Sequence, residues 1–239
     1  MNYRWNWGIL LQEPYWGWLW SGLEWTLLIS LGSWTIALVI GVTFGIARSL
    51  PNRAVQMVAG IYVEIFRNIP PLVQLFLWYF VFPEVVPDTI GLWIKRDLPH
   101  PEFITAIVAI GLFAGARVAE QVRAGIAAVG IHLMPAALAT GLRPLQAFRL
   151  VLLPLGMRAI VGPLTSEFLI TMKMSSISLT IGVLELTAES RHIENYTFQG
   201  LEAFTVATVV YLMLGLAVTG LMRAIDSRVG GAKLRRATS

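Results

Sequence analysis

Cysteine is absent from this chain of 239 residues, so disulfide bonds and thiolate metal sites are excluded. The three histidines, His100, His132 and His192, are far apart in the sequence and form no HExxH motif, and we therefore expect no metal site. The sequence also lacks a GxxxxGK[ST] loop for nucleotide phosphates and a GxSxG nucleophile motif. These absences disfavour an enzyme and predict that the chain does not itself hydrolyse ATP.

Charged residues are scarce as well. They make up 13% of the chain, against 56% hydrophobic residues, and the mean hydropathy is +0.68. A soluble domain of this length carries nearly twice that charged fraction. The composition predicts an all-α integral membrane protein with one main domain, which covers residues 21–224.

Five apolar regions are candidates for membrane-spanning helices, since a helix needs about 20 apolar residues to cross the hydrocarbon core. Pro70 and Pro71 are expected to break or kink the second region, because proline clashes with the preceding helical turn and lacks an amide N–H. The serines at 175, 176 and 178 mark a point at which the fourth region can divide into a long and a short helix. The regions are 25–47, 54–82, 103–122, 159–184 and 203–222.

Residues 1–20 are rich in aromatic side chains and lack the basic cluster and short apolar core of a cleaved signal. Aromatic rings that carry a polar atom favour the headgroup layer of a membrane. We interpret 1–20 as an interfacial segment on the periplasmic side, an anchor rather than a binding site. Its aromatic residues include Trp5, Trp7, Tyr15, Trp16, Trp18 and Trp20.

Basic residues are distributed unevenly, and this predicts the orientation of the chain. If the loop at 125–158 is cytoplasmic, most arginines and lysines fall on that side, as the positive-inside rule requires. The N-terminus is then periplasmic and residues 225–239 form a basic cytoplasmic tail. Anionic lipid headgroups, rather than nucleic acid, then explain the net charge of +4. The cytoplasmic group is Arg48, Arg53, Arg123, Arg143, Arg149, Arg158, Arg223, Arg228, Lys233, Arg235 and Arg236, and the outer group is Arg4, Lys95, Arg96 and Arg191.

The segment 135–154 is a polar-edged interruption between the third and fourth apolar regions. Pro135 suits the first turn of a helix, where a missing N–H costs nothing, and Gly141 permits the reversal that ends that helix. A second short helix is expected from Pro144 onward. Its apolar face is Leu145, Phe148 and Leu152, and the arginines that stay in solvent are Arg143 and Arg149. The pattern predicts a two-helix hairpin that projects from the membrane.

This spacing resembles the EAA loop of bacterial ABC-importer permeases, the two-helix element that docks on the ATPase subunit. Pro135 stands where that family often has glutamate. The resemblance implies a type I ABC-importer permease fold, with five transmembrane helices and a cytoplasmic two-helix coupling loop. An ordinary cytosolic hairpin between two spans is the alternative. The positions that the resemblance assigns to ATPase coupling are Pro135, Ala136, Ala137, Gly141, Leu153 and Pro154.

Several ionisable residues fall inside the apolar regions, where each costs about 2.5–3.5 kcal/mol to insert and is expected to pair. Glu64 and Arg67 are three residues apart, and we predict that they form a structural ion pair near the proline break. Glu120 can pair with Arg117 or with Arg123 in the same way.

Arg117 has a second interpretation, because its planar guanidinium matches a carboxylate in a bidentate arrangement. It either pairs with Glu120 or binds an anionic ligand. Glu167 and Lys173, in the fourth region, either line a transport pathway or have structural roles.

The resemblance extends over nearly the whole chain. The segments 62–80, 116–126 and 166–186 are similar to the polar amino acid permeases of ABC importers, and the opening NYRWNWGILLQ, the PNR at 51–53 and the GARV around Arg117 look closest to the glutamate/aspartate branch. Many relatives have tyrosine in place of Arg117, and an acid in place of Met174 when the substrate is basic. The resemblance implies that Arg117 binds a substrate carboxylate and Glu167 the α-ammonium group, with Lys173 and Met174 as further candidates.

The family also implies a set of partners. These are two cytoplasmic ATPase subunits that bind ATP and magnesium, a second permease subunit in a homo- or heterodimer, and a periplasmic substrate-binding protein, all at the bacterial inner membrane. An ion-gradient-driven secondary transporter or channel is the alternative, in which the intramembrane acids would bind protons or cations.

Overall fold

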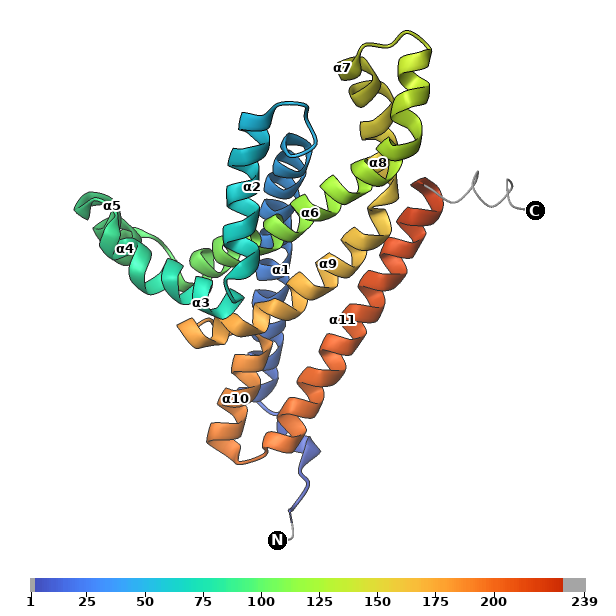
Figure 1. The fold of residues 1–239 in the computed structure, drawn as a ribbon. Coiled ribbons are helices and arrows are strands. Elements are labelled where there is room, and N and C mark those ends of the chain that lie inside the picture. The colour runs from blue at the N-terminus through green and yellow to red at the C-terminus, as the bar shows by residue number, and fades with distance from the viewer. Residues whose placement is uncertain (1–2, 230–239) are drawn as a thin grey trace. The chain divides into compact units, whose positions relative to one another are not determined.

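The structure is a computed structural model that describes residues 3–229, and every regular element within them is a helix (Figure 1). The α-helices are α1 Tyr15–Ala47, α2 Arg53–Asn68, α3 Pro71–Phe76, α4 Phe82–Val85, α5 Asp88–Leu92, α6 Pro101–Ala139, α7 Pro144–Ala147, α8 Leu153–Ala159, α9 Val161–Met174, α10 Leu186–Thr197 and α11 Gly200–Val229. Short 3₁₀ segments are η1 Trp7–Leu11 and η5 Ser175–Ile181, and π-helical segments are η2 Leu77–Val81, η3 Trp93–Asp97 and η4 Phe148–Leu152.

The predicted all-α membrane fold is confirmed. Three helical segments are long and apolar enough to cross a bilayer, namely Tyr15–Ala47, Pro101–Gly130 and Gly200–Ala224. The count rises to five if the two broken helix pairs, Arg53–Asn68 with Pro71–Val85 and Pro144–Ala159 with Val161–Ile181, are each one span.

Two of the predicted breaks occur where the sequence placed them. Helix α2 ends at Asn68 and α3 begins at Pro71, which occupies the first helical position, where its missing N–H is tolerated. The α-helical part of the fourth region ends at Met174, and the serine cluster continues as the 3₁₀ turn η5.

Other helices extend beyond the boundaries that the sequence predicted. Helix α1 starts at Tyr15, ten residues before the expected position 25, so residues 15–20 of the aromatic segment are helical and continuous with the first span. Helix α6 runs past position 122 to Ala139, and Pro135 lies inside it rather than at the start of a new helix. Pro135 has no N–H to donate to the carbonyl of residue 131, so α6 continues through it at the cost of one backbone hydrogen bond. Helix α11 extends to Val229, so the predicted tail 225–239 begins as helix, and its remainder, 230–239, is outside the described residues.

The chain divides into two compact units, which are described separately. The first comprises the chain up to Ser33, Pro70–Ile110 and Ile170–Leu216, and the second comprises Trp34–Ile69, Gly111–Leu169 and the chain from Ala217 onward. The first unit contains two apolar clusters. One is Ile29, Leu75, Ala106, Ala109, Ile110, Ile181 and Val183, and the other is Leu10, Leu19, Leu186, Ile193, Ala203 and Ala207.

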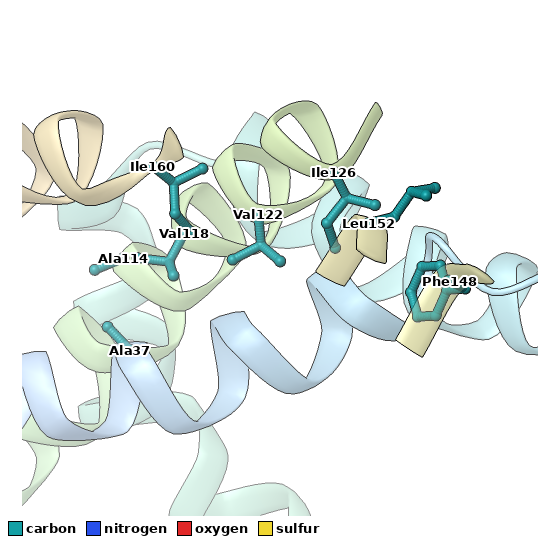
Figure 2. Close-up of a cluster of buried hydrophobic side chains, with 8 residues drawn as sticks. All are labelled: Ala37, Ala114, Val118, Val122, Ile126, Phe148, Leu152 and Ile160. Atoms are coloured by element: carbon teal, nitrogen blue, oxygen red, sulfur yellow. The ribbon is translucent and has the colours of Figure 1, made fainter. Parts of the chain in front are cut away.

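The second unit is built on one face of α6. Ala114, Val118, Val122 and Ile126 recur every four residues and point toward one cluster, which Ala37, Phe148, Leu152 and Ile160 complete (Figure 2). This core joins the second half of α1, the middle of α6 and the hairpin that follows α6.

Glycines on α1 bring that helix close to α6. A Cβ atom added at Gly41 would lie 2.5 Å from Val118 Cβ, and one added at Gly45 would lie 2.5 Å from Val122 Cβ. Glycines four residues apart let helices approach closely in membranes, where tight packing replaces the hydrophobic effect as the driving force. The contact fixes the part of α6 that carries the ionisable residues.

Candidate functional site

Arg117 and Glu167 form an ion pair between α6 and α9 within the second unit. Arg117 Nε donates to Glu167 Oε1 at 2.6 Å, and Gln121 Nε2 donates to Glu167 Oε2 at 3.0 Å. Arg117 and Gln121 are four residues apart on α6 and therefore lie on one face. The Glu167 side chain is only 2% exposed, so these charge-assisted bonds hold a carboxylate that is almost completely buried.

The guanidinium of Arg117 remains accessible. Its side chain is 38% exposed, and its charge lies 5.9 Å from the centre of the Phe113 ring. Among the described residues, its hydrogen bond to Glu167 uses Nε alone, which leaves the two Nη groups able to meet another acceptor. The predicted alternative, a pair between Arg117 and Glu120, is not formed.

Lys173 and Met174 belong to the first unit, at the end of α9. Lys173 is exposed. Met174 packs against the apolar cluster that contains Ile110 and Ile181. Their predicted roles in substrate binding remain predictions.

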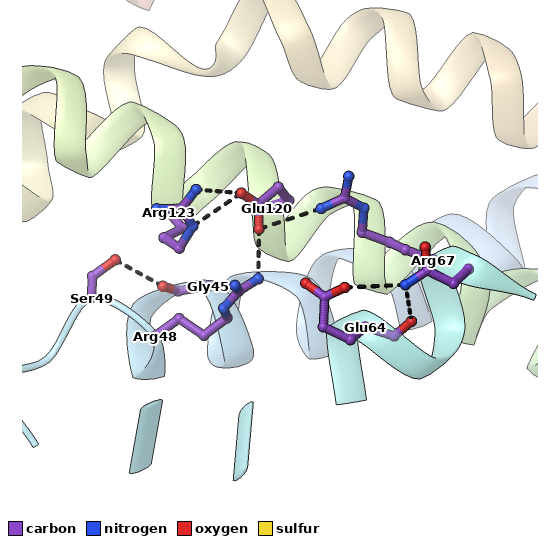
Figure 3. Close-up of polar contacts among 8 residues, drawn as sticks. Gly45, Arg48, Ser49, Glu64, Arg67, Glu120 and Arg123 are labelled. Carbon is purple, nitrogen blue, oxygen red and sulfur yellow. Dashed lines mark hydrogen bonds and ion pairs between the residues drawn. The ribbon is translucent and has the colours of Figure 1, made fainter. Parts of the chain in front are cut away.

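Glu120 is the centre of a second group of charges (Figure 3). Arg48 Nη1 lies 2.5 Å from Glu120 Oε2, Arg67 Nη1 lies 3.7 Å from the same oxygen, and Arg123 Nε donates to Oε1 at 3.0 Å. The predicted pairing of Glu120 with Arg123 is thus confirmed, and Arg48 joins α1 to it.

The predicted ion pair between Glu64 and Arg67 is wrong. The Glu64 carboxylate accepts a hydrogen bond from Asn68 Nδ2 at 3.1 Å, and Arg67 faces Glu120 instead (Figure 3). Glu64 is exposed, so a pair with Arg67 on the helix surface would gain little. Glu120 is only 24% exposed, so water screens its attraction to Arg67 less.

The hairpin after α6 is formed as predicted, apart from the position of Pro135. Gly141 has φ +87°, in the left-handed region that favours glycine, and α7 begins at Pro144. Phe148 and Leu152 are buried against the α6 cluster (Figure 2). Leu145, predicted on the same face, is 61% exposed, so the first turn of the second helix presents an apolar side chain to its surroundings.

Several side chains of the hairpin 135–154 are exposed. Arg143 and Arg149 are exposed as predicted, and Leu138 and Leu150 are exposed apolar residues beside them. Among the positions assigned to coupling, Pro135, Ala136, Gly141 and Pro154 are exposed, Leu153 is partly buried and Ala137 is buried.

Sequence reasoning missed Gln121 and the role of Arg48. Gln121 follows Arg117 by four residues, and that same-face spacing was a usable signal. Arg48 is 72 residues from Glu120, and no local pattern links residues so far apart.

Long apolar helices, an ion pair between α6 and α9 and an exposed helical hairpin are together typical of a polytopic membrane transport protein. Comparison with known proteins then identifies the family. Residues 37–231 match the family described as "Binding-protein-dependent transport system inner membrane component", and the chain belongs to this family. The resemblance stated from the sequence is confirmed.

Relatives within the family include amino acid permeases. The chain is 41% identical to the glutamate/aspartate import permease protein GltJ of Escherichia coli (strain K12), over 96% of each chain. It is 31% identical to the glutamine transport system permease protein GlnP of the same organism, over 87% of this chain and 91% of that protein.

Two solved structures of ABC transporters are similar to this chain. A chain of the "Crystal structure of an amino acid ABC transporter with histidines" matches 95% of this chain with a TM-score of 0.80 at 27% identity. The MetNI methionine ABC transporter matches 91% of it with a TM-score of 0.73 at 22% identity, which shows the shared fold.

Proposed function

We propose that the chain is a permease subunit of an ATP-driven importer for acidic amino acids, glutamate and aspartate first among them. The observation that carries the proposal is the Arg117 guanidinium, 38% exposed and held by a buried carboxylate. The 41% identity to a glutamate/aspartate permease supports the same substrate class.

Arg117 is the residue that we assign to a substrate carboxylate. Its two Nη groups can donate in parallel to both carboxylate oxygens. Without substrate, Glu167 supplies the negative charge that keeps this guanidinium inside the bundle. A bound acidic amino acid brings an additional negative charge, which Arg117 can meet without losing Glu167.

Glu167 is assigned to the α-ammonium group, with Gln121 as a positioning residue. Gln121 Nε2 bonds one oxygen of Glu167 and Arg117 Nε the other, so the carboxylate is fixed in orientation before substrate arrives. An amino acid that carries both charges would extend this alternating arrangement of positive and negative groups. Lys173 and Met174 remain further candidates for the pathway.

The hairpin 135–154 is the surface that we assign to the ATPase subunit. Exposed Leu145 and Leu150 lie among exposed Arg143 and Arg149, a mixture of apolar and cationic groups typical of a protein interface. Phe148 and Leu152 are buried against α6, so a displacement of the hairpin would move the helix that carries Arg117.

The same proposal includes partners and orientation. ATP and magnesium bind to the ATPase subunits, a second permease subunit completes the pathway, and a periplasmic protein delivers the substrate. The distribution of basic residues supports a periplasmic N-terminus and a cytoplasmic C-terminus at the bacterial inner membrane.

Replacement of Arg117 tests the substrate assignment. Arg117→Ala should lower glutamate and aspartate uptake by at least tenfold, because the carboxylate loses its charged partner, whereas Arg117→Lys should retain part of it. Uptake of labelled amino acids by the assembled importer measures this, with Arg158→Ala, an exposed arginine of α8, as the matched control. Undiminished glutamate uptake by Arg117→Ala would remove Arg117 from the site.

A further inference from the structure

A basic pocket lies where α1 ends and α2 begins, within the second unit. It has a volume of about 490 Å³ and is lined by Arg48, Arg53, Gln56, Met57 and Arg123. Three of its five lining residues are arginines, which are suited to bind phosphate oxygens in pairs.

The charge of this pocket is not balanced. Glu120 is the carboxylate that contacts Arg48 and Arg123, and among the described residues Arg53 has no acidic partner. Three guanidinium groups against one carboxylate leave two positive charges. Glu120 also lies 3.7 Å from Arg67, so its single negative charge is shared further. The pocket is therefore complementary to an anion.

An apolar groove lies on the same pair of helices. Its volume is about 410 Å³, and its lining residues, which are apolar except for the first, are Thr43, Phe44, Ala47, Ala54, Val55, Val58 and Ala59. Ala47 and Ala54 of the groove are next in sequence to Arg48 and Arg53 of the pocket. The groove and the pocket are thus lined by adjacent residues at both ends of the turn between α1 and α2.

The position of this turn agrees with the chemistry. The segment Tyr15–Ala47 is apolar enough to span a bilayer and ends immediately before Arg48, so the turn falls at the level of the lipid headgroups. A free inorganic anion would use the arginines and leave the groove unused. An acidic protein segment would pair its charges with the arginines but would not require an apolar groove beside them.

We propose that the α1–α2 hairpin binds one anionic glycerophospholipid. The phosphate and headgroup contact Arg48, Arg53 and Arg123, and one acyl chain lies in the groove between Phe44 and Val58. The bound lipid supplies the negative charge that Glu120 alone does not, and it ties α1 and α2 to α6 through Arg123.

Native mass spectrometry of the importer complex tests this, after equilibration in detergent with dioleoyl phosphatidylglycerol or dioleoyl phosphatidylcholine. We expect one phosphatidylglycerol to be retained per copy of this chain and phosphatidylcholine to be lost. Arg53→Gln should weaken retention about fivefold, and Ala54→Phe should weaken it by filling the groove. The matched control, Arg158→Gln, should retain phosphatidylglycerol as the original chain does.

Four results would overturn the proposal. Equal retention of the two lipids, or an equal loss with Arg158→Gln, would mean that the lipid binds without a specific site. Inorganic phosphate that binds as tightly as phosphatidylglycerol and is insensitive to Ala54→Phe would assign the pocket to a free anion. Because the chain has no cysteine, Ala54→Cys provides a single thiol, and a disulfide between two copies at this position in membranes would show that protein covers the groove.

Discussion

At the scale of single residues, the carboxylates of Glu120 and Glu167 differ in their surroundings. Glu120 is surrounded by Arg48, Arg67 and Arg123, an arrangement that fastens helices together. Glu167 is paired with Arg117 and accepts a hydrogen bond from Gln121, and its side chain is 2% exposed, against 24% for Glu120. The Arg117–Glu167 pair, which joins α6 to α9, is the one that we propose to bind a charged substrate.

The sequence identified these residues but not all of their partners. Helical spacing was enough to propose Glu120 with Arg123, because residues three apart meet on one helix. It could not distinguish Glu120 from Glu167 as the partner of Arg117, since α9 is brought to α6 by tertiary packing. The same limitation produced the wrong Glu64–Arg67 pair, because the competing acid lies 53 positions away from Arg67 on another helix.

Glu189 of α10 predicts a dependence of stability on pH. Burial raises the pKa of this carboxyl, the neighbouring Glu185 adds to the rise, and His192, with Nδ1 3.4 Å from Glu189 Oε2, opposes it. Because the folded pKa exceeds the ordinary value of 4.5, the folded chain binds the proton more tightly, and stability falls as pH rises from 4.5 through the raised pKa. Above the raised pKa, the contribution of Glu189 to stability no longer changes with pH.

Glu189→Gln should flatten this part of the curve, as measured by the melting temperature in detergent between pH 4 and pH 8. Some dependence should persist, because burial also raises the pKa of Glu185. An unchanged slope in the variant would show that Glu189 does not titrate over this range.

At the scale of helices, the sequence was most reliable where proline or glycine acts on the backbone. The break before Pro71 and the reversal at Gly141 follow from a missing N–H and from a positive φ. Pro135 shows the limit of that reasoning, because α6 continues through this proline at the cost of one backbone hydrogen bond. The start of α1 at Tyr15 was missed because aromatic residues suit both the interface and the helix that passes through it.

Gly41 should be intolerant of a side chain. An added Cβ would lie 2.5 Å from Val118 Cβ and 2.8 Å from the Gly115 carbonyl oxygen, so α1 and α6 would have to separate. Gly41→Ala should lower stability by about 1–3 kcal/mol, measured as a lower melting temperature of the purified protein. Gly60→Ala is the control, because a Cβ there meets nothing within 4 Å, and an equal loss in both variants would refute close packing at Gly41.

At the scale of the whole molecule, we expect the exposed face of the hairpin to contact the ATPase subunit and its buried face to stabilise the fold. Leu145 is 61% exposed whereas Leu152 is 4% exposed. Leu145→Asp should therefore reduce the amount of ATPase subunit that copurifies with the permease and leave the melting temperature unchanged. Leu152→Asp should lower the melting temperature, because it buries a charge. Normal ATPase recovery with Leu145→Asp would place the docking surface elsewhere.

Amino acid uptake into proteoliposomes tests the central claim most directly. The vesicles would contain this chain with its second permease subunit and ATPase subunits, with the binding protein outside and ATP and magnesium enclosed. The account predicts glutamate uptake that requires both ATP and the ATPase subunits and that continues when an uncoupler is added. Uptake that persists without the ATPase subunits and collapses with the uncoupler would contradict it and identify a transporter driven by an ion gradient.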